Sequence, residues 1–219
     1  MILTFMAKIT LKRPDFYGKS YPPNVVNSNR LNKSVMSRRF DFHQQKSLTQ
    51  TPEVEAAIRA ALFAYFPGLL EVHLAHLEND KRGVDYWLEF PGKLQALDVK
   101  IRTQDYAMKG DPDNVCLELV ANIGSGKPGW VLDPDKLTDW VLVYYKDSGR
   151  SYIYPFQLLQ AAVMKDMDKW KQAKQRITRQ ITKTLTGEYA SESMFKSHRD
   201  LCAAMYHHSQ KPPLETEAG

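Results

Sequence analysis

The stretch that decides the fold is Gly83–Ile101, which reads GVDYWLEF, then PGK, then LQALDVKI. Apolar and polar residues alternate along both outer arms, which is typical of strands, whose successive side chains point to opposite faces of a sheet. The Pro-Gly pair between the arms is a strong turn signal. The stretch therefore predicts a β-hairpin that closes in a tight turn.

The same alternation predicts a charged patch on one face of this hairpin. Asp85, Trp87 and Glu89 share a face of the first arm, while Asp98 and Lys100 project together from the second. Carboxylates held close together raise each other's pKa unless a cation lies between them, and a hard divalent ion bound by oxygen ligands is the usual reason for such a cluster. The alternative is an exposed hairpin with ordinary solvated charges. In both cases we expect a polar patch outside the core.

Asp85, Asp98 and Lys100 together resemble the motif of the PD-(D/E)xK nuclease superfamily, in which an Asp near the end of one strand is followed by Asp or Glu, any residue, and Lys on the next. Val84 stands where many members carry Pro. The resemblance covers residues 51–156. It implies an α/β fold with a restriction-endonuclease-like core, in which a mixed central sheet is preceded by a helix and flanked by helices.

A helix is predicted just before the motif. Thr51 is a good N-cap, Pro52 suits the first helical position, and apolar residues recur at helical spacing until Pro67-Gly68. The resemblance implies an additional metal-proximal Glu on this helix, and we assign that role to Glu55, with Glu53 as the second choice. The alternative is that Glu55 only favours the N-terminal end of the helix dipole.

Further strands are predicted at 69–77, 115–121, 138–145 and 151–154, so that the order is one helix followed only by strands up to residue 154. This order agrees with a mixed sheet whose second and third strands carry the acids. The segment 126–132 also resembles members of the superfamily in which the chain passes the active site. Glu118 is either a further acid of the site or a charge at the edge of a strand.

The resemblance also implies a mechanism, that of an endonuclease or phosphodiesterase dependent on Mg²⁺ or Mn²⁺. Asp85 and Asp98, with the carbonyl of Val99, would hold one or two metal ions, and Glu55 would complete the coordination. Lys100 would orient or help deprotonate the attacking water and offset the charge of the phosphate.

The first fifty residues form a basic N-terminal extension. They hold nine Lys or Arg against Asp15 and Asp41, a local excess of +7 in a chain with a net charge of +5. Basic residues interleaved with aromatic ones suit a nucleic-acid backbone, most of all DNA. The alternatives are a solvated tail and an arm that binds a protein partner or a second copy in a homodimer. The candidate nucleic-acid-binding residues are Lys12, Arg13, Lys19, Arg38, Arg39 and Lys127.

We divide the chain into the extension (1–50), a nuclease-like core (51–160) and a C-terminal helical segment with a tail (161–219). Apolar residues three and four apart predict one long helix over about 155–185, ended by Gly187, and a last helix over about 191–206. The many lysines and arginines of the long helix over about 155–185 are expected to lie on its solvated face.

Composition sets the remaining limits. With 43% hydrophobic residues the chain can form a core, and no apolar run approaches the length that spans a membrane. Two cysteines without a signal peptide favour a reducing cytoplasm. We reject a zinc site at His198, Cys202, His207 and His208 and a phosphate-binding loop at 124–127, because neither has the required spacing.

The sequence therefore predicts a metal-dependent DNA nuclease, of phage, plasmid or defence-system origin. The alternative is a catalytically silent protein of the same fold that binds DNA or a protein partner, as an accessory or inhibitor protein of a mobile element. Retention of both acids and the lysine favours the nuclease.

Overall fold

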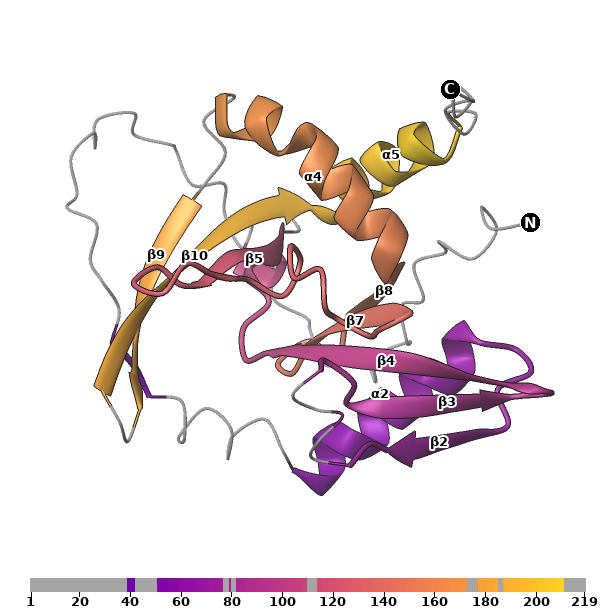
Figure 1. The fold of residues 1–219 in the computed structure, drawn as a ribbon. Coiled ribbons are helices and arrows are strands. Elements are labelled where there is room, and N and C mark those ends of the chain that lie inside the picture. The colour runs from indigo at the N-terminus through magenta and orange to yellow at the C-terminus, as the bar shows by residue number, and fades with distance from the viewer. Residues whose placement is uncertain are drawn as a thin grey trace, which may run out of the picture.

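The computed structural model describes residues 39–41, 51–76, 79, 82–109, 114–172, 177–184 and 187–210. Within these ranges the chain is mixed α/β, with two five-stranded sheets and helices packed against them (Figure 1). None of the helices in these ranges is long and apolar enough to cross a membrane.

The first sheet contains the predicted hairpin and has the strand order β2-β3-β4-β7-β8. Its strands are β2 (Glu71–Leu74), β3 (Tyr86–Phe90), β4 (Lys93–Arg102), β7 (Trp140–Tyr145) and β8 (Ser151–Pro155). β3 and β4 are antiparallel and joined by Pro91-Gly92, where Gly92 has a φ of 75°. A positive φ after proline is what a tight turn of this kind requires. Because β4 and β7 run parallel, the sheet is mixed, as predicted.

Helix α2 (Pro52–Tyr65) covers one face of this sheet. Its start is confirmed, since the Thr51 hydroxyl accepts a hydrogen bond from the Val54 N–H at 3.4 Å. The apolar face of α2 supplies Ile58 and Leu62, which pack in one cluster with Leu88 and Leu97 of the sheet. The residues that alternate with Leu97 on β4 therefore point away from α2.

The second sheet has the order β1-β9-β10-β5-β6. Its strands are β1 (Arg39–Asp41), β5 (Asn114–Asn122), β6 (Lys127–Pro128), β9 (Ile177–Thr184) and β10 (Gly187–Ser197). We expected the strand at 115–121 to join the sheet of the hairpin, and this is wrong: β5 pairs antiparallel with β10. Its partner comes from a part of the chain predicted to be helical.

The predicted helix over 155–185 is correct only in its first half. Helix α4 (Phe156–Gln172) is followed by β9, and the last helix, α5 (His198–Ser209), starts later than expected because β10 occupies residues up to Ser197. Ile177 and Ile181 are four residues apart, a spacing that one face of a helix and one face of a strand both satisfy. The β-branched residues in ITRQITKT favour the strand, since they lose side-chain freedom in a helix.

A second apolar cluster lies on the other face of the first sheet. Val141 and Val143 of β7 pack there with residues of the second sheet, of α4 and of α5, while Leu142 and Tyr144 face α2. In the parallel register Asp98 is opposite Val141 and Lys100 is opposite Val143. Both motif residues of β4 therefore point into the space between the two sheets, and the expectation of a patch outside the core is wrong.

Candidate active site

The two acids of the motif are brought together by the start of the hairpin. The N–H of Asp85 donates to the Leu97 carbonyl at 2.8 Å, which extends the β3–β4 ladder by one residue. One carboxylate oxygen of Asp85, Oδ2, accepts a hydrogen bond from the Val99 N–H at 2.6 Å. Burial, together with the charge of the neighbouring Asp98, raises the pKa of Asp85 to about 7, although Lys100 and the Val99 N–H oppose the shift.

Asp98 is the centre of the cluster. Its side chain is 3% exposed, and each of its oxygens lies 2.8 Å from an ammonium: Oδ1 from Nζ of Lys100 and Oδ2 from Nζ of Lys136. Burial alone would raise the pKa of Asp98, but the two ammonium groups outweigh it and hold that pKa below its usual value. Asp98 is therefore ionised at neutral pH.

The two lysines that contact Asp98 differ in exposure. Lys100 donates a hydrogen bond to Oδ1, and Lys136 lies at ion-pair distance from Oδ2. The side chain of Lys100 is 25% exposed and that of Lys136 is 6% exposed. The site thus opens towards solvent on the Lys100 side.

Lys100 keeps its proton. Burial would lower its pKa, but the charges of Asp98 and Asp85 outweigh this and raise the pKa above its usual value, with a smaller contribution from Glu118 of β5. The ammonium also lies over the ring of Trp130, 5.7 Å from its centroid. The segment around Trp130 therefore passes the motif, as the sequence predicts.

Lys136 is the residue that the sequence analysis missed. It lies in the loop before β7, and the N–H of the next residue, Leu137, donates to the Arg82 carbonyl at 3.0 Å. Burial and the nearby charge of Lys100 lower the pKa of Lys136. Nothing in the local sequence distinguishes this lysine from a solvated one, because its partner is 38 positions earlier in the chain.

Among the interactions of the described residues, Glu55 contacts neither of the two acids. It lies on α2, on the other side of the sheet, where its carboxylate accepts a hydrogen bond from Nε of Arg59 at 3.1 Å, and Arg59 in turn donates to the Val72 carbonyl at 2.6 Å. Glu53 is exposed, and its pKa is lowered by hydrogen bonds from its own backbone and from Thr51. The metal-binding role of Glu55 stays a prediction that no contact in the described residues supports.

The predicted nucleic-acid-binding residues are mostly not described. Lys12, Arg13, Lys19 and Arg38 lie outside the described residues, and of Arg39 only the backbone, in β1, is described. Lys127 is exposed on β6.

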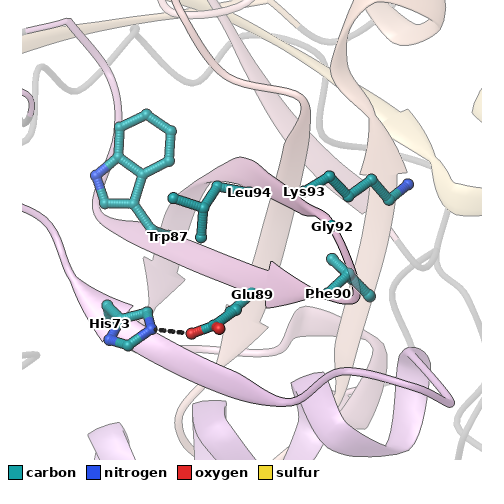
Figure 2. Close-up of a pocket in the computed structure, with 7 residues that line it drawn as sticks. All are labelled: His73, Trp87, Glu89, Phe90, Gly92, Lys93 and Leu94. Atoms are coloured by element: carbon teal, nitrogen blue, oxygen red, sulfur yellow. Dashed lines mark hydrogen bonds and ion pairs between the residues drawn. The ribbon is translucent and has the colours of Figure 1, made fainter.

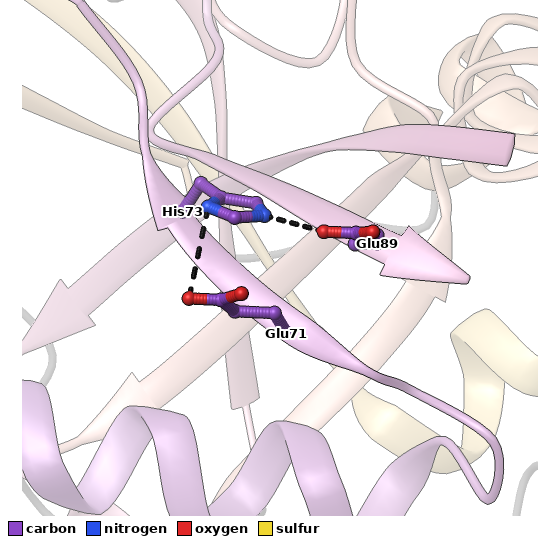
Figure 3. A group of neighbouring side chains, drawn as sticks. All are labelled: Glu71, His73 and Glu89. Carbon is purple, nitrogen blue, oxygen red and sulfur yellow. Dashed lines mark hydrogen bonds and ion pairs between the residues drawn. The ribbon is translucent and has the colours of Figure 1, made fainter. Parts of the chain in front are cut away.

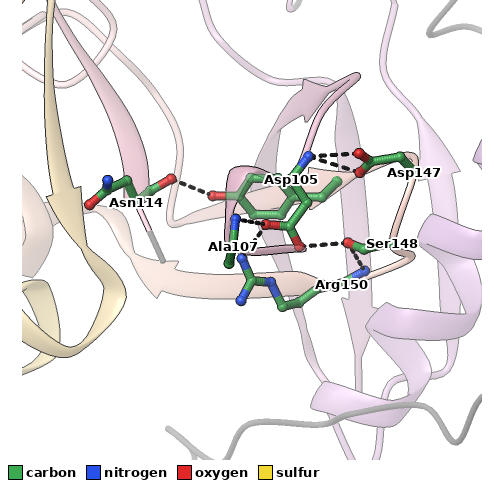
Figure 4. Close-up of polar contacts among 7 residues, drawn as sticks. Asp105, Ala107, Asn114, Asp147, Ser148 and Arg150 are labelled. Atoms are coloured by element: carbon green, nitrogen blue, oxygen red, sulfur yellow. Dashed lines mark hydrogen bonds and ion pairs between the residues drawn. The ribbon is translucent and has the colours of Figure 1, made fainter. Parts of the chain in front are cut away.

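A partly buried network of hydrogen bonds lies just beyond the end of β4 (Figure 4). The N–H of Asp105 donates to the carboxylate of Asp147 at 2.9 Å, and the carboxylate of Asp105 accepts hydrogen bonds from Ser148 and from the Arg150 guanidinium. Asp105 precedes the short 3-10 helix η2 (Tyr106–Lys109), and the other three residues belong to the turn between β7 and β8. The network therefore ties the segment after the motif strand to the neighbouring strands of the same sheet.

A second group of possible metal ligands lies on the outer strands of the first sheet. Nε2 of His73 is 2.7 Å from Glu89, and its Nδ1 is 4.0 Å from Glu71 (Figure 3). His73 and Glu89 also line an open hollow of about 590 Å³ that includes Trp87 and Leu94 (Figure 2). Both side chains of the His73–Glu89 pair are 42% exposed, so the pair is a solvated surface feature, apart from the buried cluster around Asp98.

Comparisons of the chain with protein-family models, curated proteins and solved structures found no match. The functional argument therefore rests on the geometry around Asp98.

Proposed function

We propose that this chain is a metal-dependent nuclease that hydrolyses phosphodiester bonds, in DNA before RNA, with Asp85, Asp98 and Lys100 at its centre. The observation that carries the proposal is the approach of two carboxylates from the two arms of one hairpin, with an ammonium 2.8 Å from the buried one. Buried charges are costly to a fold, and strongly shifted pKa values concentrate at functional sites.

The donor set suits a hard divalent ion. Asp85 and Asp98 supply carboxylate oxygens, the Val99 carbonyl follows Asp98 directly in the chain, and Oδ2 of Asp98 is a buried oxygen paired with the Lys136 ammonium. A bound Mg²⁺ or Mn²⁺ would supply Lewis-acid polarisation of the phosphodiester and a more acidic water.

Lys100 has a defined role in this proposal. Because its pKa is raised, its side chain stays protonated near neutral pH and cannot serve as a base there. Its ammonium, on a side chain that is 25% exposed, can donate to a phosphate oxygen and stabilise the negative charge that grows on the phosphate during hydrolysis. We therefore favour charge stabilisation over deprotonation of water as the role of Lys100.

One observation favours a second candidate, a catalytically silent protein of the same fold. Lys100 and Lys136 together balance the charges of Asp85 and Asp98, so the cluster is neutral without any metal when all four groups are ionised. A protein that only binds nucleic acid or a protein partner would need no metal ion in addition to this charge-balanced cluster.

A cleavage assay separates the two candidates. Wild type, Asp98→Asn and Lys100→Met are incubated with plasmid DNA and labelled single-stranded DNA and RNA, with Mg²⁺, Mn²⁺ or EDTA. We expect cleavage by wild type with metal only, and a loss of about 100-fold or more in both variants, as for other groups that stabilise transition-state charge. Asp168→Asn, at an exposed acid of α4, is the control and should cut like wild type.

Two results would reject the nuclease proposal. One is the absence of metal-dependent cleavage of every substrate by wild type. The other is undiminished cleavage by Asp98→Asn and Lys100→Met at matched purity.

A further inference from the structure

We propose that Lys136 is a resident counter-ion of Asp98, which a divalent cation must displace to enter the site. The inference rests on the proposed metal-dependent function and concerns how that same site is loaded. Lys136 then lowers the metal affinity of the site and stabilises its metal-free form.

The charge balance of the cluster gives the first argument. Two carboxylates, Asp85 and Asp98, lie with two ammonium groups, and Asp98 has one ammonium on each oxygen at 2.8 Å. With all four groups ionised, a divalent ion added to this set would leave an excess of two positive charges beside a nearly inaccessible carboxylate. Charges interact more strongly away from bulk water, so the ion is accommodated better when one ammonium leaves.

The geometry identifies Lys136 as the ammonium that leaves. Lys100 belongs to the same strand as Asp98 and donates a hydrogen bond to Oδ1. Lys136 comes from a loop and contacts Oδ2 as an ion pair at 2.8 Å. A lysine has a flexible four-carbon stem and can withdraw its ammonium without a change in the backbone.

Gly83 leaves the space that the side chain of Lys136 occupies. Gly83 has a φ of 79°, and a Cβ at this position would lie 2.3 Å from Nζ and 2.8 Å from Cγ of Lys136. The adjacent hydrogen bond between the Leu137 N–H and the Arg82 carbonyl fixes the loop against the same turn. The ammonium also lies 5.9 Å from the centroid of the Phe156 ring. The turn at Gly83, the loop that carries Lys136 and the start of α4 at Phe156 thus together position the Lys136 side chain beside Asp98.

Calorimetric titration of the full chain with Mn²⁺, without nucleic acid, tests the inference. We expect Lys136→Met, which keeps most of the length of the side chain and removes its charge, to bind Mn²⁺ about tenfold or more tightly than wild type. Lys136→Arg keeps the charge and should bind no more tightly than wild type. Lys171→Met, a change at an exposed lysine of α4, is the control for net charge and should leave the affinity unchanged.

Thermal unfolding gives a second, independent measurement. In EDTA, Lys136→Met should melt below wild type, because Asp98 loses one of its two partners. Saturating Mn²⁺ should raise the melting temperature of Lys136→Met more than that of wild type, since stabilisation by a ligand grows with its affinity.

The outcomes separate this inference from the proposed function. Equal Mn²⁺ affinity in wild type and Lys136→Met, or weaker binding by a folded Lys136→Met, rejects the counter-ion role and leaves the nuclease proposal in place. Failure of both proteins to bind Mn²⁺ rejects both.

Discussion

Asp85 and Asp98 are neighbouring residues of the same type whose pKa values are shifted in opposite directions. Asp98 has two ammonium partners, which hold its pKa low despite complete burial. Burial and the negative charge of Asp98 both disfavour the ionised form of Asp85, so its pKa rises to about 7. Such divergence within a pair of titratable groups is a mark of functional sites.

The raised pKa of Asp85 predicts a pH-dependent gain in stability on Asp85→Asn. Between about pH 4 and pH 7 the folded protein keeps a proton on Asp85 that the unfolded chain has already released, so the free energy of unfolding of wild type falls as pH rises through this window. Asparagine does not titrate there, and its side-chain oxygen can still accept from the Val99 N–H. We expect Asp85→Asn to be more stable than wild type at pH 8, on the order of 2 kcal/mol, with a smaller difference at pH 5.

Urea denaturation in EDTA at the two pH values measures this difference. Asp168→Asn, at an exposed acid of α4, serves as control and should show no such pH-dependent gain. A gain for Asp85→Asn that is equal at pH 5 and pH 8 would contradict the assignment of the shifted pKa to Asp85.

At the scale of elements, the turn that carries Gly83 and the loop that carries Lys136 are predicted to be coupled. Gly83→Ala places a Cβ where the Lys136 stem lies and also forces a residue with a side chain into a positive φ, which alone costs roughly 1–2 kcal/mol. In a Lys136→Ala background the collision with the stem is gone and only the backbone cost remains. Gly83→Ala should therefore cost at least about 1 kcal/mol less in that background.

A double-mutant cycle of unfolding free energies checks the coupling between Gly83 and Lys136. Gly92→Ala supplies the matched glycine, because Gly92 also has a positive φ but nothing lies within 4 Å of its added Cβ. Its cost should be the same with and without Lys136→Ala. Equal costs of Gly83→Ala in the two backgrounds would mean that the stem of Lys136 does not occupy the position described.

The sequence alone predicts correctly those elements that are determined by residues close to one another in the chain. The hairpin of β3 and β4 follows from alternation and from Pro91-Gly92, and the start of α2 follows from Thr51 and Pro52. The pairing of β5 with β10 and the contact of Lys136 with Asp98 join distant parts of the chain, and no local pattern signals them. For the same reason the convergence of Asp85 and Asp98 was predictable, while the burial of Asp98 was not.

At the scale of the whole molecule, the basic extension and the folded part are connected through β1. Arg39–Asp41 pairs in parallel with β9 at the edge of the second sheet. A truncation that tests the extension must therefore leave this strand intact. Removing residues 1–37 takes away six basic residues against Asp15, a net charge of +5.

The last prediction concerns the binding of DNA by the chain without residues 1–37. Each phosphate that a basic residue neutralises contributes about −0.9 to the slope of log affinity against log salt on duplex DNA. We expect the truncated chain to bind more weakly and with a slope flatter by about two to four units, measured by fluorescence anisotropy in EDTA over a series of salt concentrations. Metal-dependent cleavage at low salt and saturating DNA should persist, because Asp85, Asp98 and Lys100 all lie outside the deleted segment.

A matched chain in which the basic residues of 1–37 are replaced by glutamine should behave like the truncation. An unchanged salt slope in both proteins would show that the extension does not contact DNA, and binding to a second copy or a protein partner would then be its better explanation.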